Sequence, residues 1–339
     1  MTAFSPITNV FLRLATLPRF NTMKVMQFFL SLKMLPALII AISISLNCLF
    51  ASEPSDPNDQ CDLGIKYING IGVPKDGVKA VEWLKRSADQ GCIKAQSNLG
   101  YCYEQGIGGR KDIKEAIYWY QKAANQGDVT TQSCLAMIFD EGRGVQKDPL
   151  QAVKWYRKAA DQGDAFAQSK LGDHYLKGEG VAKNELEAIN WYRKAADQGR
   201  DGDQYTLGDC YEKGIGVSKD EIEATKWYLK AADKNNMVAQ YKVGECYENA
   251  VGINRNLTKA IYWYRQSADN GNPLAAYVLG KFYIQGIGVP RDYIEGYKWL
   301  NISNVLDARE RLDKLETKMT PDQIAEAQKL SKAWRPFHK

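Results

Sequence analysis

Seven of the eight tryptophans in this chain stand 36 residues apart without a single slip. They are Trp83, Trp119, Trp155, Trp191, Trp227, Trp263 and Trp299. An unbroken period of this length over most of a 339-residue chain is typical of a stacked-repeat array. Each unit of such an array contacts only its neighbours, so the array can grow long without dividing into globular domains. Arrays of this kind mostly present surfaces that hold partners, which favours a binding function over catalysis.

One unit, residues 93–128, shows how the period is built. Its first half carries apolar side chains at Ala95, Leu99 and Tyr103, a spacing of four that lines one face of an α-helix. Gly106 is then expected to end this helix, because glycine readily adopts the positive φ that a helix exit requires. We therefore expect every unit to begin with a helix that runs into a glycine-containing loop.

The second half of the unit predicts another helix. Asp112 can accept the free amide hydrogens of the first turn, and Glu115 three residues later completes a capping box. The same pairing returns at Asn184 with Glu187, Asp220 with Glu223, and Asp292 with Glu295. Trp119 and Tyr120 are expected to be buried, with small alanine and glycine residues letting helix axes approach to roughly 8–10 Å. Each unit is thus predicted to be a helical hairpin.

The units share one pattern: Ala-x-x-x-Leu-Gly-x-x-Tyr-x-x-Gly-x-Gly-Val, then Asp, then Ala-x-x-Trp-Tyr-x-Lys-Ala-Ala-x-Gln-Gly. It is nearly intact in residues 167–199 and recurs over residues 57–308. This pattern resembles the Sel-1-like repeat, a relative of the tetratricopeptide repeat. The resemblance implies an all-α fold, a right-handed α–α superhelix or solenoid of about seven 36-residue helical hairpins with a C-terminal capping helix.

The end of the chain is expected to close the array. We assign residues 53–308 to seven repeats and residues 309–339 to capping helices and a tail. Thr320 is a suitable N-cap, with Pro321 at the first helical position and Gln323 at the capping-box position. A closing helix would cover the apolar end of the last repeat, which every open array requires.

Residues 1–52 are expected to be a signal peptide or an N-terminal membrane anchor. Four basic residues and no acidic ones precede Glu53, and the stretch 34–51 is uncharged and mostly apolar. Basic residues followed by an apolar core and a polar segment are typical of a secretory signal, and Ala51 suits the last position before cleavage. About 18 apolar residues can also just span a bilayer, so an inner-membrane anchor is the alternative.

Charge argues against a nucleic-acid partner. The net charge of the chain is +5, and removal of the four basic residues of 1–52 leaves +1 on the rest. A nearly neutral array lacks the basic surface that phosphate backbones require. The partner is therefore expected to be a protein or peptide, with membrane contact only through the N-terminal segment if it stays uncleaved.

The family resemblance implies a protein-protein interaction scaffold or adaptor, often exported in bacteria. The chain does not end in a Lys-Asp-Glu-Leu-type signal, as expected of a bacterial rather than an endoplasmic-reticulum protein. A periplasmic or secreted protein is therefore expected. Two alternatives stay open: a cell-envelope hydrolase of the β-lactamase-like kind ascribed to some cysteine-rich relatives, and a regulatory adaptor anchored in the inner membrane.

No catalytic residue, cofactor or metal site is expected. A β-lactamase-like reaction needs an activated serine, commonly in Ser-x-x-Lys, and no such tetrapeptide occurs. His174, Cys210 and Cys246 occupy one helix position in three successive repeats. Helices roughly 8–10 Å apart cannot easily bring three side chains within about 2.3 Å of one metal. His174 is therefore expected to be a core side chain, and the cysteines mostly free, buried thiols.

The first helix of each unit also has a face outside the core positions. On residues 93–128 it contains positions 98, 101 and 105, which lie together because they are three and four residues apart. By analogy with tetratricopeptide arrays, this face is expected to line a concave groove that holds a peptide or protein segment. The predicted partner-binding residues are Tyr101, Gln105, Met137, Glu141, Lys170, Asp173, Lys177, Asp209, Lys213, Lys242, Glu245 and Lys281.

The fifth and sixth repeats depart from the pattern. Asn235 replaces the glycine that links two units, and Ala250 replaces the first glycine of a loop. Two interpretations stay open: neutral drift, or a local bend or looser joint in the superhelix near residues 199–256.

Overall fold

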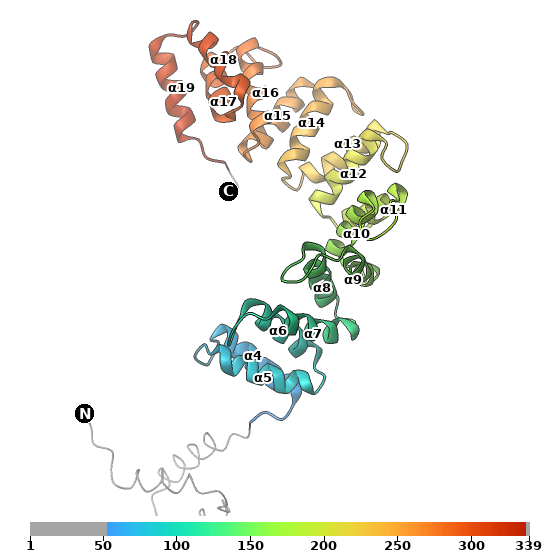
Figure 1. Cartoon of the computed structure of the whole chain (residues 1–339). Helices are drawn as coiled ribbons and strands as arrows, with labels where there is room; N and C mark the ends of the chain where they lie inside the picture. Colours follow the sequence, from blue (N-terminus) through green and yellow to red (C-terminus); the bar gives the residue numbers. More distant parts are fainter. Residues whose placement is uncertain (1–52, 337–339) are drawn as a thin grey trace, which may run out of the picture. The chain divides into compact units, whose positions relative to one another are not determined.

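The computed structural model describes residues 53–336, which contain sixteen α-helices and no strand (Figure 1). Consecutive helices contact one another from α5 onward, as expected of stacked hairpins. The helices are α4 (Pro57–Asn69), α5 (Gly77–Asp89), α6 (Ile93–Gln105), α7 (Ile113–Asn125), α8 (Val129–Glu141), α9 (Pro149–Asp161), α10 (Ala165–Lys177), α11 (Glu185–Asp197), α12 (Asp201–Lys213), α13 (Glu221–Ala232), α14 (Met237–Asn249), α15 (Leu257–Asp269), α16 (Pro273–Gln285), α17 (Tyr293–Ser303), α18 (Leu306–Glu316) and α19 (Pro321–Ala333). The predicted all-α repeat superhelix is confirmed.

The two ends of the chain differ in what the structure describes. The predicted signal or anchor, residues 1–52, lies outside the described residues. Among the helices of residues 53–336, none is both long and apolar enough to cross a membrane. At the other end, α19 has the predicted cap: the Thr320 amide donates to Gln323 at 3.0 Å, and the Gln323 amide donates to the Thr320 hydroxyl at 3.3 Å.

The first helix of each hairpin ends as predicted on a left-handed residue. Gly106 has φ 75°, and its amide donates to the carbonyl of Cys102. The loop glycine two residues further on has a second role that sequence reasoning missed. A Cβ at Gly252 would lie 2.0 Å from the carbonyl oxygen of Glu221 in the preceding hairpin. Successive hairpins therefore approach backbone to backbone at this loop, which only glycine permits.

The second helices begin on the predicted N-caps, but the predicted capping boxes are only half correct. Asn184 accepts from the Glu187 amide at 3.0 Å, as expected. The Glu187 carboxylate does not return to the N-cap and instead accepts from the indole N–H of Trp191 at 2.9 Å. The same bond joins Trp299 to Glu295 at 2.9 Å, whereas the indole N–H groups of Trp119 and Trp227 have no hydrogen-bond partner.

Within four of the hairpins, a tyrosine of the second helix packs against a glycine of the first, at Gly100, Gly172, Gly208 and Gly244. A Cβ at Gly100 would lie only 2.5 Å from Cδ1 of Tyr120. The absence of a side chain therefore allows the ring to lie directly on the backbone of α6. The Tyr120 hydroxyl then donates to the Glu104 carboxylate at 2.9 Å, which satisfies the buried phenol.

The periodic tryptophans lie between hairpins, as predicted. Trp227 shares a cluster with Ile189 and Tyr192 of the preceding hairpin and is 5% exposed. The Lys230 ammonium lies 3.5 Å from the centroid of the indole ring. The lysine of the Trp-Tyr-x-Lys pattern thus covers the outer side of the ring through a cation–π contact. Trp263 is the exception, because it is only partly buried.

A ladder of side-chain amides ties successive hairpins together, and sequence reasoning missed it. Gln96 of α6 donates to the Ala88 carbonyl at the end of α5 at 3.1 Å, and accepts from Gln126, which follows α7, at 2.7 Å. The same amide pair recurs as Gln162 with Gln132, Gln198 with Gln168, and Asn270 with Gln240. Buried amides with both groups satisfied favour a single arrangement of neighbouring hairpins.

The ladder is broken in the hairpins that the sequence singled out. Lys234 occupies the place of the donating amide, and the Oε1 of buried Gln204 has no hydrogen-bond partner. The adjacent Asn235 has φ 66° and Ala250 has φ 62°, a region that side-chain-bearing residues rarely adopt. The region therefore combines a missing hydrogen bond with two unfavourable backbone conformations, which favours the looser-joint interpretation.

Substitution Lys234→Gln is expected to stabilise the array by restoring the amide pair. An unsatisfied buried acceptor costs about 1–3 kcal/mol, so urea unfolding should show a gain of about 1 kcal/mol. Lys154→Gln is the matched control, because Lys154 is also exposed but lies outside the ladder. If Lys234→Gln raised the free energy of unfolding no more than Lys154→Gln, the missing amide pair would not be what lowers the stability of the array.

Cys61, Cys102, Cys210 and Cys246 are buried free thiols, as predicted. Burial, together with the neighbouring Cys92, raises the pKa of Cys61 to about 12. Burial alone raises the pKa of Cys102 to about 11. Burial and the Glu104 carboxylate also hold the pKa of Tyr120 above its usual range. The folded array thus strongly disfavours ionisation of these groups.

The array is therefore expected to lose stability at alkaline pH. The unfolded chain ionises cysteine near about 8.5 and tyrosine near about 10, while the folded chain keeps these groups neutral to higher pH. This stabilisation is complete below those unfolded values and is lost as pH rises toward about 11 to 12. The midpoint of thermal unfolding, followed by circular dichroism, should fall between about pH 9 and pH 11. A constant midpoint across that range would contradict the assignment.

Candidate partner-binding face

All twelve predicted residues lie on the first helices of successive hairpins, α6, α8, α10, α12, α14 and α16. Five are exposed, namely Tyr101, Gln105, Glu141, Lys177 and Lys213, and the other seven are partly buried. The residue types at these positions differ from one hairpin to the next, although every hairpin has an equivalent first helix. We call this set of twelve the first-helix face; its role in binding stays a prediction.

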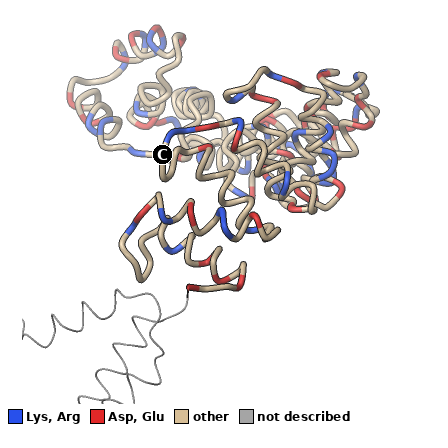
Figure 2. Tube along the Cα trace, turned by 60° about the horizontal axis from the view of Figure 1, so that its bottom comes forward, with Lys and Arg blue, Asp and Glu red and all other residues tan. Residues whose placement is uncertain are grey.

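Charges of both signs alternate along the array (Figure 2). On the first-helix face many of them pair with one another. The Lys213 ammonium lies 2.8 Å from the Asp209 carboxylate, and Lys242 lies 3.4 Å from Glu245 and 3.2 Å from Glu212 of the preceding hairpin. Such partly exposed ion pairs contribute little to stability. A partner can therefore replace them with pairs to its own charged groups at little cost in free energy.

Asp173 differs from the other acidic residues of this face because it is also tied to the core. It accepts from the buried hydroxyl of Tyr192 at 2.7 Å. Burial and this carboxylate raise the pKa of Tyr192 above its usual range. Asp173 is therefore held in place by the second helix of its own hairpin, while Lys170 lies 3.9 Å away on the solvent side.

Four predicted residues meet in one cavity of about 400 Å³, and the other eight do not contribute to it. The cavity is lined by Asp140, Glu141, Lys147, Lys170, Asp173, His174, Lys177 and Glu179. Sequence reasoning missed Asp140, Lys147 and Glu179. The available signals were a histidine at a position that is apolar in the other hairpins from α6 onward, and an acidic residue between two loop glycines.

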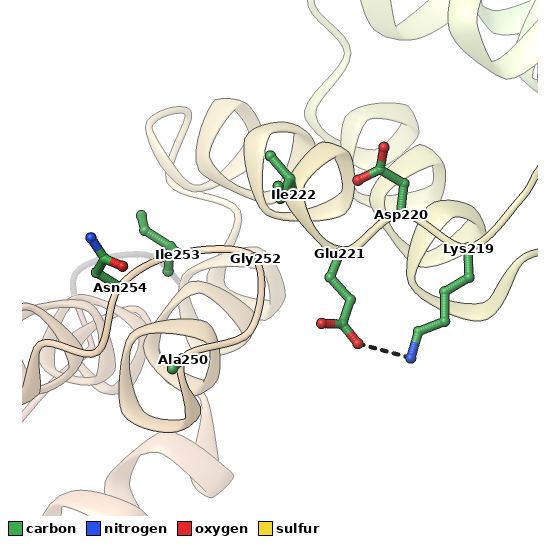
Figure 3. Close-up of a pocket in the computed structure, with 8 residues that line it drawn as sticks. All are labelled: Lys219, Asp220, Glu221, Ile222, Ala250, Gly252, Ile253 and Asn254. Atoms are coloured by element: carbon green, nitrogen blue, oxygen red, sulfur yellow. Dashed lines mark ion pairs between the residues drawn. The ribbon is translucent and has the colours of Figure 1, made fainter.

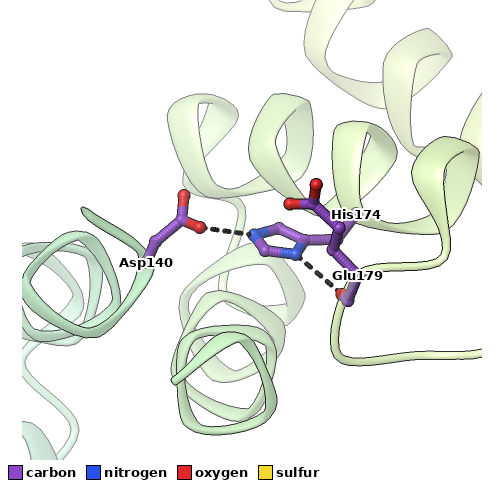
Figure 4. Close-up of side chains that lie close together, drawn as sticks. All are labelled: Asp140, His174 and Glu179. Carbon is purple, nitrogen blue, oxygen red and sulfur yellow. Dashed lines mark hydrogen bonds and ion pairs between the residues drawn. The ribbon is translucent and has the colours of Figure 1, made fainter. Parts of the chain in front are cut away.

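His174 is buried, as predicted, but it is a polar side chain with polar partners. Its Nδ1 lies 2.8 Å from the backbone carbonyl oxygen of Glu179, and its Nε2 lies 3.4 Å from Oδ1 of Asp140 (Figure 4). The tilted ring of Tyr156 packs beside it, with centroids 5.7 Å apart. The row with Cys210 and Cys246 has no common site: Cys246 instead accepts from the Thr225 hydroxyl at 3.4 Å.

A larger cavity, of about 820 Å³, lies between the start of α13 and the loop after α14 (Figure 3). Lys219 and Glu221 form an ion pair of 2.8 Å at its edge, and Asp220 is engaged in capping α13. Its other lining residues are Ile222, Ala250, Gly252, Ile253 and Asn254.

The chain was compared with models of known protein families. The model described as "Sel1 repeat" matches seven times, at residues 57–92, 93–128, 135–164, 165–199, 203–236, 238–272 and 273–303. The matches cover most of the described part of the chain and follow the hairpins one by one. No curated protein matches the chain.

The solved structures that are similar to the chain include two repeat proteins. One is the Sel1 repeat protein from Oxalobacter formigenes, with 31% sequence identity, coverage of 84% of this chain and 82% of that chain, and a TM-score of 0.68. The other is c5321, a protective antigen present in uropathogenic Escherichia coli strains displaying an SLR fold. Its identity is 26%, the coverage is 82% of this chain and 84% of that chain, and the TM-score is 0.47.

Proposed function

The chain belongs to the Sel1 repeat family of protein-protein interaction scaffolds, and we propose that it holds a peptide or protein segment along the first-helix face, which lines a groove. The observation that carries this proposal is variability at structurally equivalent places. Tyr101, Asp209 and Lys281 occupy the same position on the first helices α6, α12 and α16, whereas the core residues around them repeat. Because packing in the core does not determine the residue at these positions, they can be selected for contact with a ligand.

The chemistry of the face favours a protein segment over a polyanion. Tyr101 is 47% exposed and offers an aromatic surface at one end. Lysines and carboxylates alternate further along, in pairs such as Lys213 with Asp209. A segment with an apolar part and charges of both signs matches this order, whereas nucleic acid would need a continuous basic surface.

We further propose that the scaffold acts outside the cytoplasm of a bacterium. Support comes from the order of residues in 1–52, where basic residues precede the apolar stretch 34–51. The similar Sel1 repeat protein from Oxalobacter formigenes supports a bacterial origin. The protein is then periplasmic or secreted after cleavage, and the alternative is an adaptor held in the inner membrane by residues 34–51.

Charge reversal on the first-helix face is expected to abolish partner binding. The variant reverses Lys170, Asp173, Lys177 and Lys213 together, and its matched control reverses Lys114, Lys154, Asp161 and Lys226, which are exposed on second helices. Proteins that co-purify with the full chain would be identified, expressed and measured by calorimetry. The face variant should bind each at least about ten-fold more weakly, a loss of about 1.4 kcal/mol. Equal affinity of both variants for every partner would refute the proposed face.

Export is expected to leave a mature chain that begins at Ser52, directly after Ala51. The measurement is fractionation of a C-terminally tagged full chain, followed by sequencing of the N-terminus. Recovery of a shortened chain in the periplasm or medium supports cleavage. An intact chain in the membrane fraction would support the anchored adaptor instead, and a cytoplasmic chain would reject export in either form.

A further inference from the structure

One helix position distinguishes the fourth hairpin from the others. The equivalent residues in α6, α8, α12, α14 and α16 are Cys102, Ile138, Cys210, Cys246 and Phe282, all of them buried. In α10 this position holds His174, which is only 3% exposed. An imidazole in an apolar position needs partners for both ring nitrogens.

The contact at Nδ1 determines how the ring is protonated there. The backbone carbonyl of Glu179, 2.8 Å away, can only accept, so Nδ1 carries the hydrogen. In a neutral imidazole the lone pair of Nε2 then faces the Asp140 carboxylate, which is also an acceptor. Two acceptors that face each other inside a protein require a cation between them, either a proton or a metal ion.

The distance separates these two possibilities. Nε2 and Oδ1 of Asp140 are 3.4 Å apart, whereas a charge-assisted N–H···O bond is normally about 2.7–2.9 Å. Two ligands of one tetrahedral metal, each bound at about 2.0–2.1 Å, are separated by about 3.3–3.4 Å. The pair is therefore spaced as ligands of a shared metal ion and is too wide for a strong ion pair.

Glu179 supplies a third ligand from the loop after α10. One ring nitrogen of His174, one carboxylate oxygen of Asp140 and one of Glu179 all lie within 4.8 Å of one another. The Glu179 side chain turns back beside the ring (Figure 4). It is 44% exposed and is engaged only weakly by Lys147, whose Nζ lies 3.8 Å away, so it can move onto a metal.

We propose that Asp140, His174 and Glu179 form a binding site for a divalent transition metal of the zinc type. Imidazole with carboxylates suits zinc, whereas magnesium and calcium prefer oxygen ligands alone. The Nδ1–H bond to a backbone carbonyl is the support that metal-bound histidines receive in proteins. The fourth position opens toward the cavity of about 400 Å³, where water or a partner's side chain can complete the coordination.

No metal site was expected at His174 from the sequence, because the row that it forms with Cys210 and Cys246 is spread over separate helices. The site proposed here is built differently. Asp140 belongs to α8 of the third hairpin, while His174 and Glu179 belong to the fourth. A bound metal would therefore link two hairpins in the middle of the first-helix face. Since the unfolded chain cannot present these ligands together, metal binding is expected to stabilise the folded array.

The test uses the full chain, freed of metal with a chelator and titrated with zinc in a calorimeter. Magnesium and calcium are titrated separately. We expect one zinc ion per chain at this site, a higher thermal midpoint with zinc, and little effect of magnesium or calcium. His174→Phe should weaken zinc binding at least about ten-fold. It should keep the fold, because Phe282 occupies the same position in α16.

Two further variants keep the test decisive if His174→Phe fails to fold. Asp140→Asn removes a ligand at a partly exposed place and should also weaken zinc binding at least about ten-fold. Glu141→Gln is the control, because Glu141 lines the same cavity but pairs with Arg143 at 3.0 Å. Zinc binding that is unchanged in Asp140→Asn would assign the metal to cysteines elsewhere. Failure of the unaltered chain to bind zinc would overturn the proposal. An imidazolium at His174 in nitrogen-15 spectra would then show that His174 and Asp140 form an ion pair instead.

Discussion

The contact between a tyrosine ring and a bare glycine backbone sets the spacing of the two helices in four of the seven hairpins. Because Gly100 has no Cβ, Tyr120 lies directly on the first helix, and its hydroxyl reaches Glu104. Successive residues of a helix point about 100° apart, so Trp119 is turned toward the preceding hairpin and packs with Leu84 and Leu99. The orientation of Tyr120 within its hairpin thus also determines that Trp119 contacts the preceding hairpin. The tyrosine–glycine contact recurs at Gly172, Gly208 and Gly244, whereas Ala136 stands at this place in the third hairpin.

Sequence periodicity predicted the parts of the fold that are local to one unit. Helix positions, the left-handed loop glycines and the N-caps such as Asn184 follow from residues a few places apart, and they were predicted correctly. The errors and omissions concern contacts with other units or with buried polar groups. Glu187 left its capping box because Trp191 needed an acceptor once it was buried. The pair of Gln96 and Gln126 joins residues 30 places apart, whereas helical periodicity relates only residues a few places apart.

The candidate site divides in the same way. Helical spacing placed the twelve residues of the first-helix face on the correct helices, because that face follows from positions within one helix. It could not bring Asp140 to His174, since these residues lie on first helices of different hairpins, nor could it place Glu179, whose position depends on a loop. A histidine at a position occupied elsewhere by Ile138 and Phe282 was the visible signal. Its role could be inferred only once the structure placed Asp140 and Glu179 beside it.

The amide ladder has a consequence for how such a chain evolves in length. Each rung joins a glutamine of a first helix to the amide that follows the second helix of the same hairpin, as in Gln132 with Gln162. Duplication or loss of one whole unit therefore leaves every remaining rung intact and adds or removes one. Insertion of a single residue between the two amides would instead shift one of them out of reach. The array can thus change its length in steps of one hairpin, whereas a single inserted residue would remove the rung of that hairpin.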